Sequence, residues 1–543
     1  MLNNKEGHSL LNSDGIISVN DLTLSFNSSP DHEVIKNINF HINKGETVAI
    51  IGESGSGKSV TASAIMGLFD KSIVNIRSGG VFYQDRNILN FSNKELSDLY
   101  GKKISIVFQD PLLAFNPVLS VGYQISESMT IHGVPKRIAR TRTLNLLSRV
   151  GILNPQLRYK DYPHQFSGGQ RQRLLIAMAI SMTPDLLIAD EPTSALDSNI
   201  KTQIISLLKD IQMENQMGML FITHDIVLAK GFADRIIVMK NGQIVESGYS
   251  QDIFLHPKHE YTKMLISCIP GSGKPNQDVN PRKSLLDVVG LNQSYPLSKG
   301  LFFGTPGVKN VLDDVSFTVY ENEVLCVVGE SGSGKSTLVK SLLGLQKYNS
   351  GLIKLSGRPI NPSCKDDIRY LRSGIQAIFQ DPASSLNPLM NIQELISEGL
   401  SDLNGDEDTV EQRVHDLLIS VGLPPDCNQR FPHEFSGGQL QRVAIARALG
   451  SQPKLLIADE AVSALDVSIQ FKIINLLREL KRKTNFSILF ITHDLALVKD
   501  FADRVIVLSD GRVVENGTAE QIFTQPRSDV TRELLVSANL YTV

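Results

Sequence analysis

The sequence predicts an α/β fold class with two similar domains in tandem. Short apolar runs alternate with segments of helical periodicity, which is typical of buried parallel strands joined by crossover helices. Five motifs occur twice in the same order, and three of them recur at a spacing of 269 residues. In each copy the motif GESGSGKS lies between an apolar run and a helical segment. These observations indicate two copies of one domain.

The first copy contains the elements of the predicted sheet in order. Residues 46–51 (ETVAII) form a short apolar run, and residues 59–69, after the glycine-rich motif, have a helical pattern. A second helix is predicted over 170–182. The runs at 186–191 and 218–225 predict two more strands that are buried on both faces.

Each copy also contains a hairpin signal. Residues 235–248 hold two alternating runs around Asn241-Gly242, and the second copy has Asp510-Gly511 at the same place. Both dipeptides readily adopt the left-handed backbone of a tight turn. We therefore expect antiparallel strands added to each α/β core.

A segment rich in proline, glycine and charge separates the two copies. Residues 269–284, IPGSGKPNQDVNPRKS, show no apolar period. We predict a first domain over 1–268, a linker over 269–284 and a second domain over 285–543.

Composition excludes several classes of protein. With 41% apolar residues the chain can build sizeable cores, and its net charge of −3 gives no overall basic field toward nucleic acid. The four cysteines form no CxxC pair, so neither a disulfide scaffold nor a zinc ribbon is expected. No apolar run is long enough to span a bilayer, and the N-terminus lacks the apolar core of a signal peptide. We expect an intracellular chain whose membrane role depends on a partner.

The glycine-rich motif fits the pattern GxxxxGK[ST] of a phosphate-binding loop. Its glycines let backbone N–H groups surround phosphates at a helix N-terminus, its lysine reaches the β- and γ-phosphates, and its serine hydroxyl ligates Mg²⁺. Two occurrences in the same context make chance a negligible explanation. The residues expected to bind nucleotide are Gly52, Ser54, Gly55, Gly57, Lys58 and Ser59 in the first copy, and Gly329, Ser331, Gly332, Gly334, Lys335, Ser336 and Thr337 in the second.

Paired carboxylates end one predicted strand in each copy, as Asp190-Glu191 and Asp459-Glu460. An aspartate there can complete the Mg²⁺ shell, while the glutamate polarises the attacking water. One such pair alone would be interpreted as surface acidic residues. Because each pair follows a phosphate loop in its own domain, we favour the catalytic interpretation.

A histidine and a glutamine accompany these carboxylates. His224 and His493 end strands in the motif THD, and Gln109 and Gln380 follow apolar runs in the motif FQDP. A lone strand-end histidine is more often structural, and a lone glutamine carries little information. The repetition in the same order favours a role for the histidines at the γ-phosphate.

The motif SGGQ begins a predicted helix in each copy. A serine N-cap followed by glycine N–H groups makes an anion site, although an ordinary capped helix would begin in the same way. The residues are Ser167, Gly168, Gly169 and Gln170 in the first copy, and Ser436, Gly437, Gly438 and Gln439 in the second.

With these motifs in order in both halves, the chain resembles the ATP-binding cassette (ABC) ATPases over nearly its whole length. The motifs above match Walker A, Q-loop, signature, Walker B and switch histidine, and residues 194–197 and 463–466 match the D-loop. The resemblance implies two P-loop NTPase domains, each with a RecA-like core, an antiparallel β subdomain and a helical signature subdomain. It also implies ATP and Mg²⁺ as cofactors.

The resemblance further implies two composite sites, because cassettes of this family close head to tail around two ATP molecules. One site would join Lys58, Ser59, Gln109, Asp190, Glu191 and His224 to Ser436 and Gly438. The other would join Lys335, Ser336, Gln380, Asp459, Glu460 and His493 to Ser167 and Gly169. The implied catalytic residues are Glu191, His224, Gln109, Glu460, His493 and Gln380, and the implied metal ligands are Ser59, Gln109, Asp190, Ser336, Gln380 and Asp459.

Family members also place an aromatic residue on the adenine. Phe26 and Tyr295 are the best placed for such stacking. Both could equally be aromatic residues of a strand core, and the sequence leaves the two interpretations open.

Finer features resemble the oligopeptide, dipeptide and nickel importers. They are FQDPLLAFNP (108–117), FQDPASSLNP (379–388), YPHQFSGGQ, FPHEFSGGQ and HPKHEYTKML (256–265). The tandem arrangement is similar to the ATPase subunit of the microcin C-type peptide importers. This resemblance implies two transmembrane permease subunits as partners, touched near 114–116 and 384–386, and a substrate-binding protein as an indirect partner. It implies no nucleic-acid partner, and a peripheral place at the cytoplasmic face of the inner membrane.

Two other functions fit the sequence less well. A ribosome-acting tandem cassette would carry a long charged helical linker, and a DNA-repair cassette would need zinc-binding cysteines and a more basic surface. Peptide is the expected cargo, with nickel or glutathione as alternatives. Only Cys268 follows the first cassette, so no iron–sulfur cluster is expected.

The second copy departs from the first directly after its glutamate. Ala461-Val462 replaces Pro192-Thr193, which changes the backbone preference there. Because Glu460 remains, we expect both sites to hydrolyse ATP.

Overall fold

The computed structural model describes residues 15–69, 72–193, 196, 198–267, 283–296, 308–330, 332–400, 407–463, 465–538 and 540. The chain forms two compact units, one built mainly from residues before 270 and the other from residues after it. Several predicted features lie outside the described residues, namely most of the linker, Ser331, Cys268, and Ser194, Ala195, Asp197 and Ala464 of the D-loops. The domain boundaries therefore stay a prediction.

The first unit contains two sheets. A four-stranded antiparallel sheet has the order β2-β1-β4-β5, and a six-stranded sheet has the order β10-β9-β3-β8-β7-β6. In the second sheet all neighbours are parallel except β10, which pairs antiparallel with β9. The strands are β1 (Gly15–Phe26), β2 (Ser29–Asn43), β3 (Thr47–Ile51), β4 (Val74–Tyr83), β5 (Arg86–Asn87), β6 (Ile104–Val107), β7 (Leu186–Asp190), β8 (Gly218–Thr223), β9 (Arg235–Lys240) and β10 (Gln243–Tyr249).

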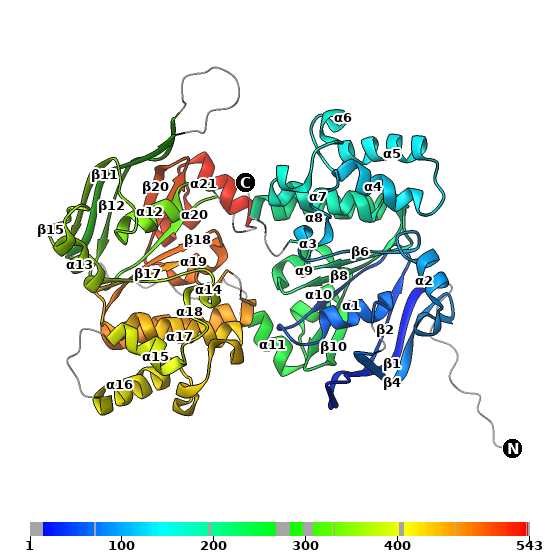
Figure 1. Ribbon diagram of the computed structural model, residues 1–543, viewed down its shortest axis with the longest axis horizontal. Coiled ribbons are helices and arrows are strands. Elements are labelled where there is room, and N and C mark those ends of the chain that lie inside the picture. The colour runs from blue at the N-terminus through cyan, green and yellow to red at the C-terminus, as the bar shows by residue number, and fades with distance from the viewer. Residues whose placement is uncertain are drawn as a thin grey trace. The chain divides into compact units, whose positions relative to one another are not determined.

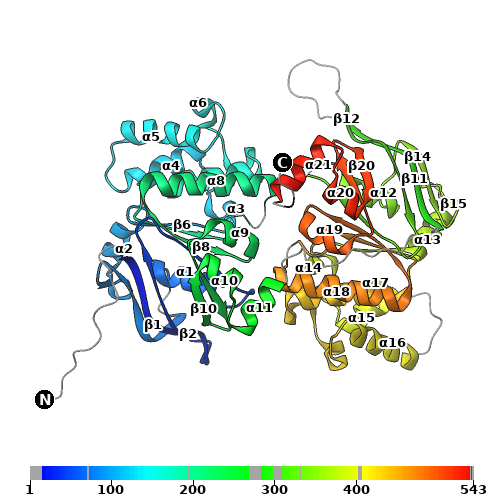
Figure 2. The same cartoon turned by 180° about the vertical axis from the view of Figure 1, so that it is seen from behind.

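Helices cover the parallel sheet of the first unit, and α4, α5 and α7 gather on one side of it (Figure 1; the reverse view is Figure 2). The α-helices are α1 (Lys58–Met66), α2 (Asn93–Leu99), α3 (Pro111–Ala114), α4 (Val121–Thr130), α5 (Lys136–Arg149), α6 (Pro155–Arg158), α7 (Gly168–Ala179), α8 (Ser198–Asn215), α9 (Ile226–Phe232), α10 (Ser250–Leu255) and α11 (Glu260–Ser267). Two short 3₁₀ helices are η1 (Ile88–Asn90) and η2 (Pro163–Gln165).

The parallel sheet is buried on both faces, which explains its uninterrupted apolar strands. In β3, Val48 and Ile50 join a core shared with β1, β2 and α1, whereas Ala49 and Ile51 join a core shared with α4, α5 and α7. Successive side chains of a strand point to opposite faces, so one strand contributes to both cores. The predicted α/β class is confirmed.

The second unit repeats this plan, with sheets β12-β11-β14-β15 and β16-β17-β18-β13-β19-β20. Its strands are β11 (Ser284–Pro296), β12 (Val308–Tyr320), β13 (Val324–Val328), β14 (Ser350–Leu355), β15 (Arg358–Pro359), β16 (Ile375–Ile378), β17 (Leu455–Asp459), β18 (Ser487–Thr492), β19 (Arg504–Ser509) and β20 (Arg512–Thr518). Its helices are α12 (Lys335–Leu342), α13 (Lys365–Gly374), α14 (Pro382–Ser385), α15 (Ile392–Ser397), η3 (Glu398–Leu400), α16 (Glu407–Ser420), η4 (Pro425–Gln429), η5 (Pro432–Glu434), α17 (Gly437–Gly450), α18 (Val467–Thr484), α19 (Leu495–Phe501), α20 (Ala519–Thr524) and α21 (Asp529–Ser537).

The predicted elements are present with shifted ends. The strands expected near 46–51, 186–191 and 218–225 are β3, β7 and β8. The helix expected over 59–69 ends at Met66, because Gly67 adopts a left-handed backbone with φ of 60°. The helix expected over 170–182 begins two residues earlier, at Gly168.

Candidate functional site

The phosphate loop of each unit connects a central strand to a buried helix. Gly57 caps α1 with φ of 101°, and Gly334 caps α12 with φ of 106°. A Cβ at Gly334 would lie 2.6 Å from the carbonyl oxygen of Val311, so only glycine fits this approach. The motif therefore has the loop shape that its sequence predicts.

The loop lysines are buried and fold back over their own loops. Lys58 Nζ donates to the carbonyl oxygens of Gly52 and Glu53 at 2.9 and 3.0 Å. Lys335 Nζ makes the equivalent bonds to Gly329 and Glu330 at 2.7 and 2.8 Å. Each cation thus lies inside the loop that is expected to hold phosphates.

The loops fit a polyphosphate ligand. In the described residues, the buried hydroxyls of Ser56 and Ser333 have no hydrogen-bond partner. A Cβ at Gly55 would meet no atom within 4 Å, so the loop is open at that point. A buried cation and an unpartnered donor beside an open space suit an anion.

The carboxylates at the ends of β7 and β17 lie near the loops. In the first unit the Ser59 hydroxyl donates to Asp190 at 3.2 Å, and a hydroxyl with a carboxylate is a donor set that fits Mg²⁺. Burial raises the pKa of Asp190, although the Ser59 hydrogen bond opposes the rise. In the second unit burial, with the neighbouring Glu460 carboxylate, raises the pKa of Asp459 to about 6.

Glu191 and its copy-two equivalent Glu460 have left-handed backbones, with φ of 46° and 47°. Gln109 Nε2 donates to the Glu191 carboxylate at 3.2 Å, and His224 Nδ1 lies 3.1 Å from the same oxygen. Burial alone would raise the pKa of Glu191, but the His224 hydrogen bond and the charges of His224 and Lys58 together hold that pKa below its ordinary value. The first unit therefore brings the predicted glutamine, glutamate and histidine together.

The second unit brings only part of this set together. His493 Nδ1 lies 3.3 Å from the Glu460 carboxylate, and this hydrogen bond lowers the pKa of Glu460. Among the described residues of this unit, Gln380 makes no hydrogen bond to Glu460, and Ser336 makes none to Asp459. The two candidate sites therefore differ in detail although their motifs match.

The SGGQ motif begins α7 and α17, as the sequence predicts. The Ser167 hydroxyl accepts from the Gln170 N–H at 3.3 Å, and the Gln170 side chain accepts from the Ser167 N–H at 3.1 Å. A Cβ at Gly169 would lie 2.8 Å from Ile200 Cγ2, whereas one at Gly168 would meet no atom within 4 Å. The second glycine thus serves packing, and the first leaves the helix start open.

The two candidate adenine aromatics differ in their surroundings. Phe26 packs partly against the core of the first unit. Tyr295 is 40% exposed, and its hydroxyl accepts a hydrogen bond from Gln346. Tyr261 is a further residue at the phosphate loop that the motifs did not predict, and its hydroxyl accepts from the Glu53 N–H. Its segment, HPKHEYTKML, carried a resemblance but no sign of which element it contacts.

Fold and site together define an ATPase with two P-loop cassettes in one chain. A model of the ABC transporter family matches residues 35–194 and 312–463, and the model of the oligopeptide/dipeptide transporter C-terminal region matches residues 245–293. The chain belongs to the ABC transporter family, as an ATP-binding subunit that hydrolyses ATP. In the described part of the chain, no helix is long and apolar enough to cross a membrane.

Several relatives align over nearly the whole chain. The uncharacterized ABC transporter ATP-binding protein YejF of Escherichia coli is 41% identical over 96% of this chain and 99% of that protein. The peptidoglycan transport ATP-binding protein YejF of Agrobacterium fabrum is 40% identical over 97% of each chain. The glutathione import ATP-binding protein GsiA of Salmonella typhimurium is 40% identical over 97% of this chain and 90% of that protein.

Proposed function

We propose that the chain is the energy-coupling ATPase of an importer for peptides or peptide-like molecules. The observation that carries the cargo class is the match of residues 245–293 to the oligopeptide/dipeptide transporter C-terminal region. The names of the relatives, which concern glutathione and peptidoglycan, describe cargo with peptide bonds and support the same class. Nickel is the alternative cargo that the sequence leaves open.

We propose that the loop lysines, the strand-end carboxylates and the SGGQ motifs bind ATP and catalyse its hydrolysis. Lys58 and Lys335 would turn from loop carbonyls to phosphate oxygens. Glu191 and Glu460, which the histidines keep ionised, would orient the attacking water and accept its proton. Mg²⁺ bound at Ser59–Asp190 and Ser336–Asp459 would neutralise phosphate charge. As the family resemblance implies, the SGGQ motif of each copy would complete the site of the other.

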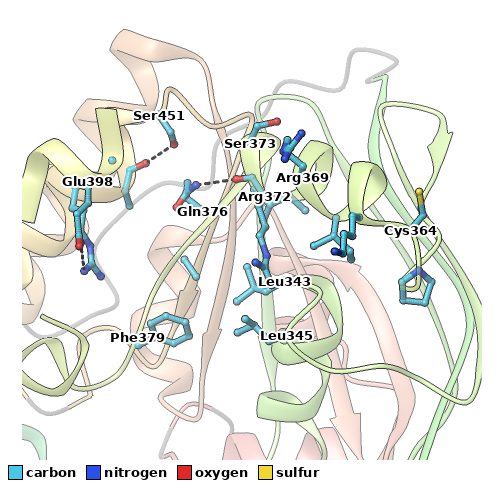
Figure 3. Close-up of a pocket in the computed structure, with 18 of the residues that line it drawn as sticks. Leu343, Leu345, Cys364, Arg369, Arg372, Ser373, Gln376, Phe379, Glu398 and Ser451 are labelled. Atoms are coloured by element: carbon cyan, nitrogen blue, oxygen red, sulfur yellow. Dashed lines mark hydrogen bonds and ion pairs between the residues drawn. The ribbon is translucent and has the colours of Figure 1, made fainter. Parts of the chain in front are cut away.

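We propose that each unit docks a permease subunit in a groove beside its parallel sheet. The groove of the second unit has a volume of about 810 Å³ and lies between α13, η3 and the end of α17 (Figure 3). Four cations line it, Lys365, Arg369, Arg372 and Arg447, against the single carboxylate of Glu398. Phe379, which precedes Gln380, also lines it, so an occupant would lie beside the ATP site.

The equivalent groove of the first unit has about 710 Å³ and lies between α2, α4 and the end of α1. Its lining includes Leu68, Phe69, Leu96 and Ile131, and among the described residues it includes no Lys, Arg, Asp or Glu. We therefore propose an acidic permease segment for the second groove and an uncharged one for the first. The sequence predicted permease contacts at 114–116 and 384–386. For Phe115 and Leu386 this prediction is wrong, because both side chains are buried in their own units and are not at the surface.

Uptake by cells that lack this gene tests the cargo. We expect loss of uptake of labelled peptides, restored by the natural chain but not by a chain carrying Lys58→Ala and Lys335→Ala. Normal peptide uptake beside lost nickel uptake would contradict the proposal. Immunoblots of the two chains at equal expression provide the control.

A further inference from the structure

The last helix of the first cassette contacts its phosphate loop. The Glu53 N–H, from the second residue of the loop, donates to the Tyr261 hydroxyl at 3.1 Å. Tyr261 lies on α11, 208 residues away in sequence, and is only 3% exposed. A hydrogen bond to a buried side chain restrains the backbone group that donates it.

Both backbone polar groups of Glu53 make hydrogen bonds. Its N–H donates to Tyr261, and its carbonyl oxygen accepts from Lys58 Nζ at 3.0 Å. When Lys58 turns to a phosphate, the carbonyl loses that bond. The Tyr261 bond is compatible with a bound phosphate, since it does not involve the Lys58 side chain.

Tyr261 itself is firmly placed. Lys240 Nζ lies 4.6 Å from the centroid of its ring, a cation–π contact. Its N–H donates to His259 Nδ1 at 3.1 Å. The Glu246 carboxylate on β10 accepts from the N–H groups of Lys258 and His259 at 2.8 and 3.0 Å, which fixes the start of α11.

The second cassette has the same anchor, but its sequence has a valine at the position that corresponds to Tyr261. Glu515 on β20 accepts from the N–H groups of Arg527 and Ser528 at 2.9 and 3.0 Å, as Glu246 does in the first copy. Counting from this anchor, Val530 stands at the place of Tyr261. A valine has no hydroxyl to accept from the Glu330 N–H, although both loops read GESGSGKS.

We propose that Tyr261 is a positioning residue that holds the first loop in its phosphate-binding shape, so that the first cassette binds ATP more tightly than the second. The proposal rests on the proposed role of the two loops as phosphate sites. A loop held in its bound shape loses less freedom on binding, which raises affinity without a new ligand contact.

Titration of a fluorescent ATP analogue with Mg²⁺ into the full chain tests this. In the Lys335→Ala chain only the first loop should bind the analogue, and in the Lys58→Ala chain only the second loop should bind it. We expect tighter binding in the Lys335→Ala chain. Adding Tyr261→Phe, which keeps the ring and deletes the hydroxyl, should weaken that binding about threefold to tenfold and leave the Lys58→Ala chain unchanged.

Tyr83→Phe is the matched control, because it removes the hydroxyl of another buried tyrosine, which donates to Asp185 at 2.6 Å. This variant should lower the unfolding temperature without weakening the binding of the ATP analogue. Equal affinity of the two loops, or an equal effect of Tyr261→Phe in both backgrounds, would overturn the proposal. No binding in either background would overturn the phosphate-loop role itself, which separates the two failures.

Discussion

Glu191 and Glu460 share an unusual backbone although different residues follow them. A left-handed conformation at a residue with a side chain costs about 1 kcal/mol. The Glu191 N–H donates to the Ile222 carbonyl, and the Glu460 N–H to the Ile491 carbonyl, each at 2.9 Å. These bonds to the neighbouring strand hold the glutamate conformation. The glutamate therefore keeps this conformation in both copies, although Pro192 follows it in the first copy and Ala461 in the second.

We expect Glu191→Gln and Glu460→Gln, made separately, each to lower the ATPase rate of the assembled transporter. Loss of a general base costs about 100-fold or more at the site that carries it. If the two sites contribute equally, the total rate should therefore fall about twofold, and further if the two sites depend on each other. Phosphate release over time measures the rate. A variant with an unchanged rate would identify its site as vestigial.

The two glycines of the first SGGQ motif should respond differently to a methyl group. Gly169→Ala would push a Cβ against Ile200 on α8, so we expect a loss of about 1–3 kcal/mol of unfolding free energy. Gly168→Ala meets open space and should change stability by less than about 0.5 kcal/mol. Denaturant unfolding followed by circular dichroism compares them. Similar losses for both would contradict the assigned packing role.

Sequence alone predicted the chemical role of each site residue better than it predicted which side chains that residue contacts. The repeated motifs predicted that Gln109, Glu191 and His224 belong to one site, and the structure brings them together. The same motifs gave no reason for the lack of a hydrogen bond between Gln380 and Glu460. Such differences depend on side-chain orientation, which short motifs do not encode.

At the scale of elements, local signals were the reliable ones. Asn241 and Gly242 have φ of 49° and 81°, and Asp510 and Gly511 have 46° and 77°, so both predicted hairpin turns are confirmed. The contact of α11 with the phosphate loop was not predictable in this way. It joins residues 208 positions apart, and no periodicity or turn signal specifies such a pairing.

The anchor of α11 should depend on pH. Burial would raise the pKa of Glu246, but hydrogen bonds from the N–H groups of Lys258 and His259 help to hold it below its ordinary value. A lowered pKa contributes stability above the ordinary value of 4.5, and that contribution is lost as the pH falls. We expect Glu246→Gln to speed hydrogen exchange over 258–267 at pH 7, with the difference shrinking toward pH 4.

Glu260 is the control for this experiment, because it is an exposed carboxylate in the first turn of the same helix. Glu260→Gln should change exchange at neutral pH much less than Glu246→Gln. An effect of Glu246→Gln that is the same at both pH values would contradict an ionised anchor.

At the scale of the molecule, the groove of the second unit should require its positive charge. We expect Arg369→Glu with Arg372→Glu to reduce membrane retention and peptide uptake severalfold, since like charges repel an acidic segment. Fractionation of cells that express the permease measures retention. Arg142→Glu, a reversal of an exposed cation on α5 outside both grooves, is the control. Equal retention of the two variants would contradict the groove assignment.

The identical loops with unlike surroundings have a consequence for how such a protein evolves. In a dimer of one repeated cassette, every substitution appears in both halves, so an improvement on one side is forced on the other. Here the two halves are separate segments of one chain, so a substitution in one half is not copied into the other. The first half can therefore have Tyr261 where the second half has Val530. Selection can therefore tune one half for holding nucleotide and the other for releasing it, without altering the shared loop.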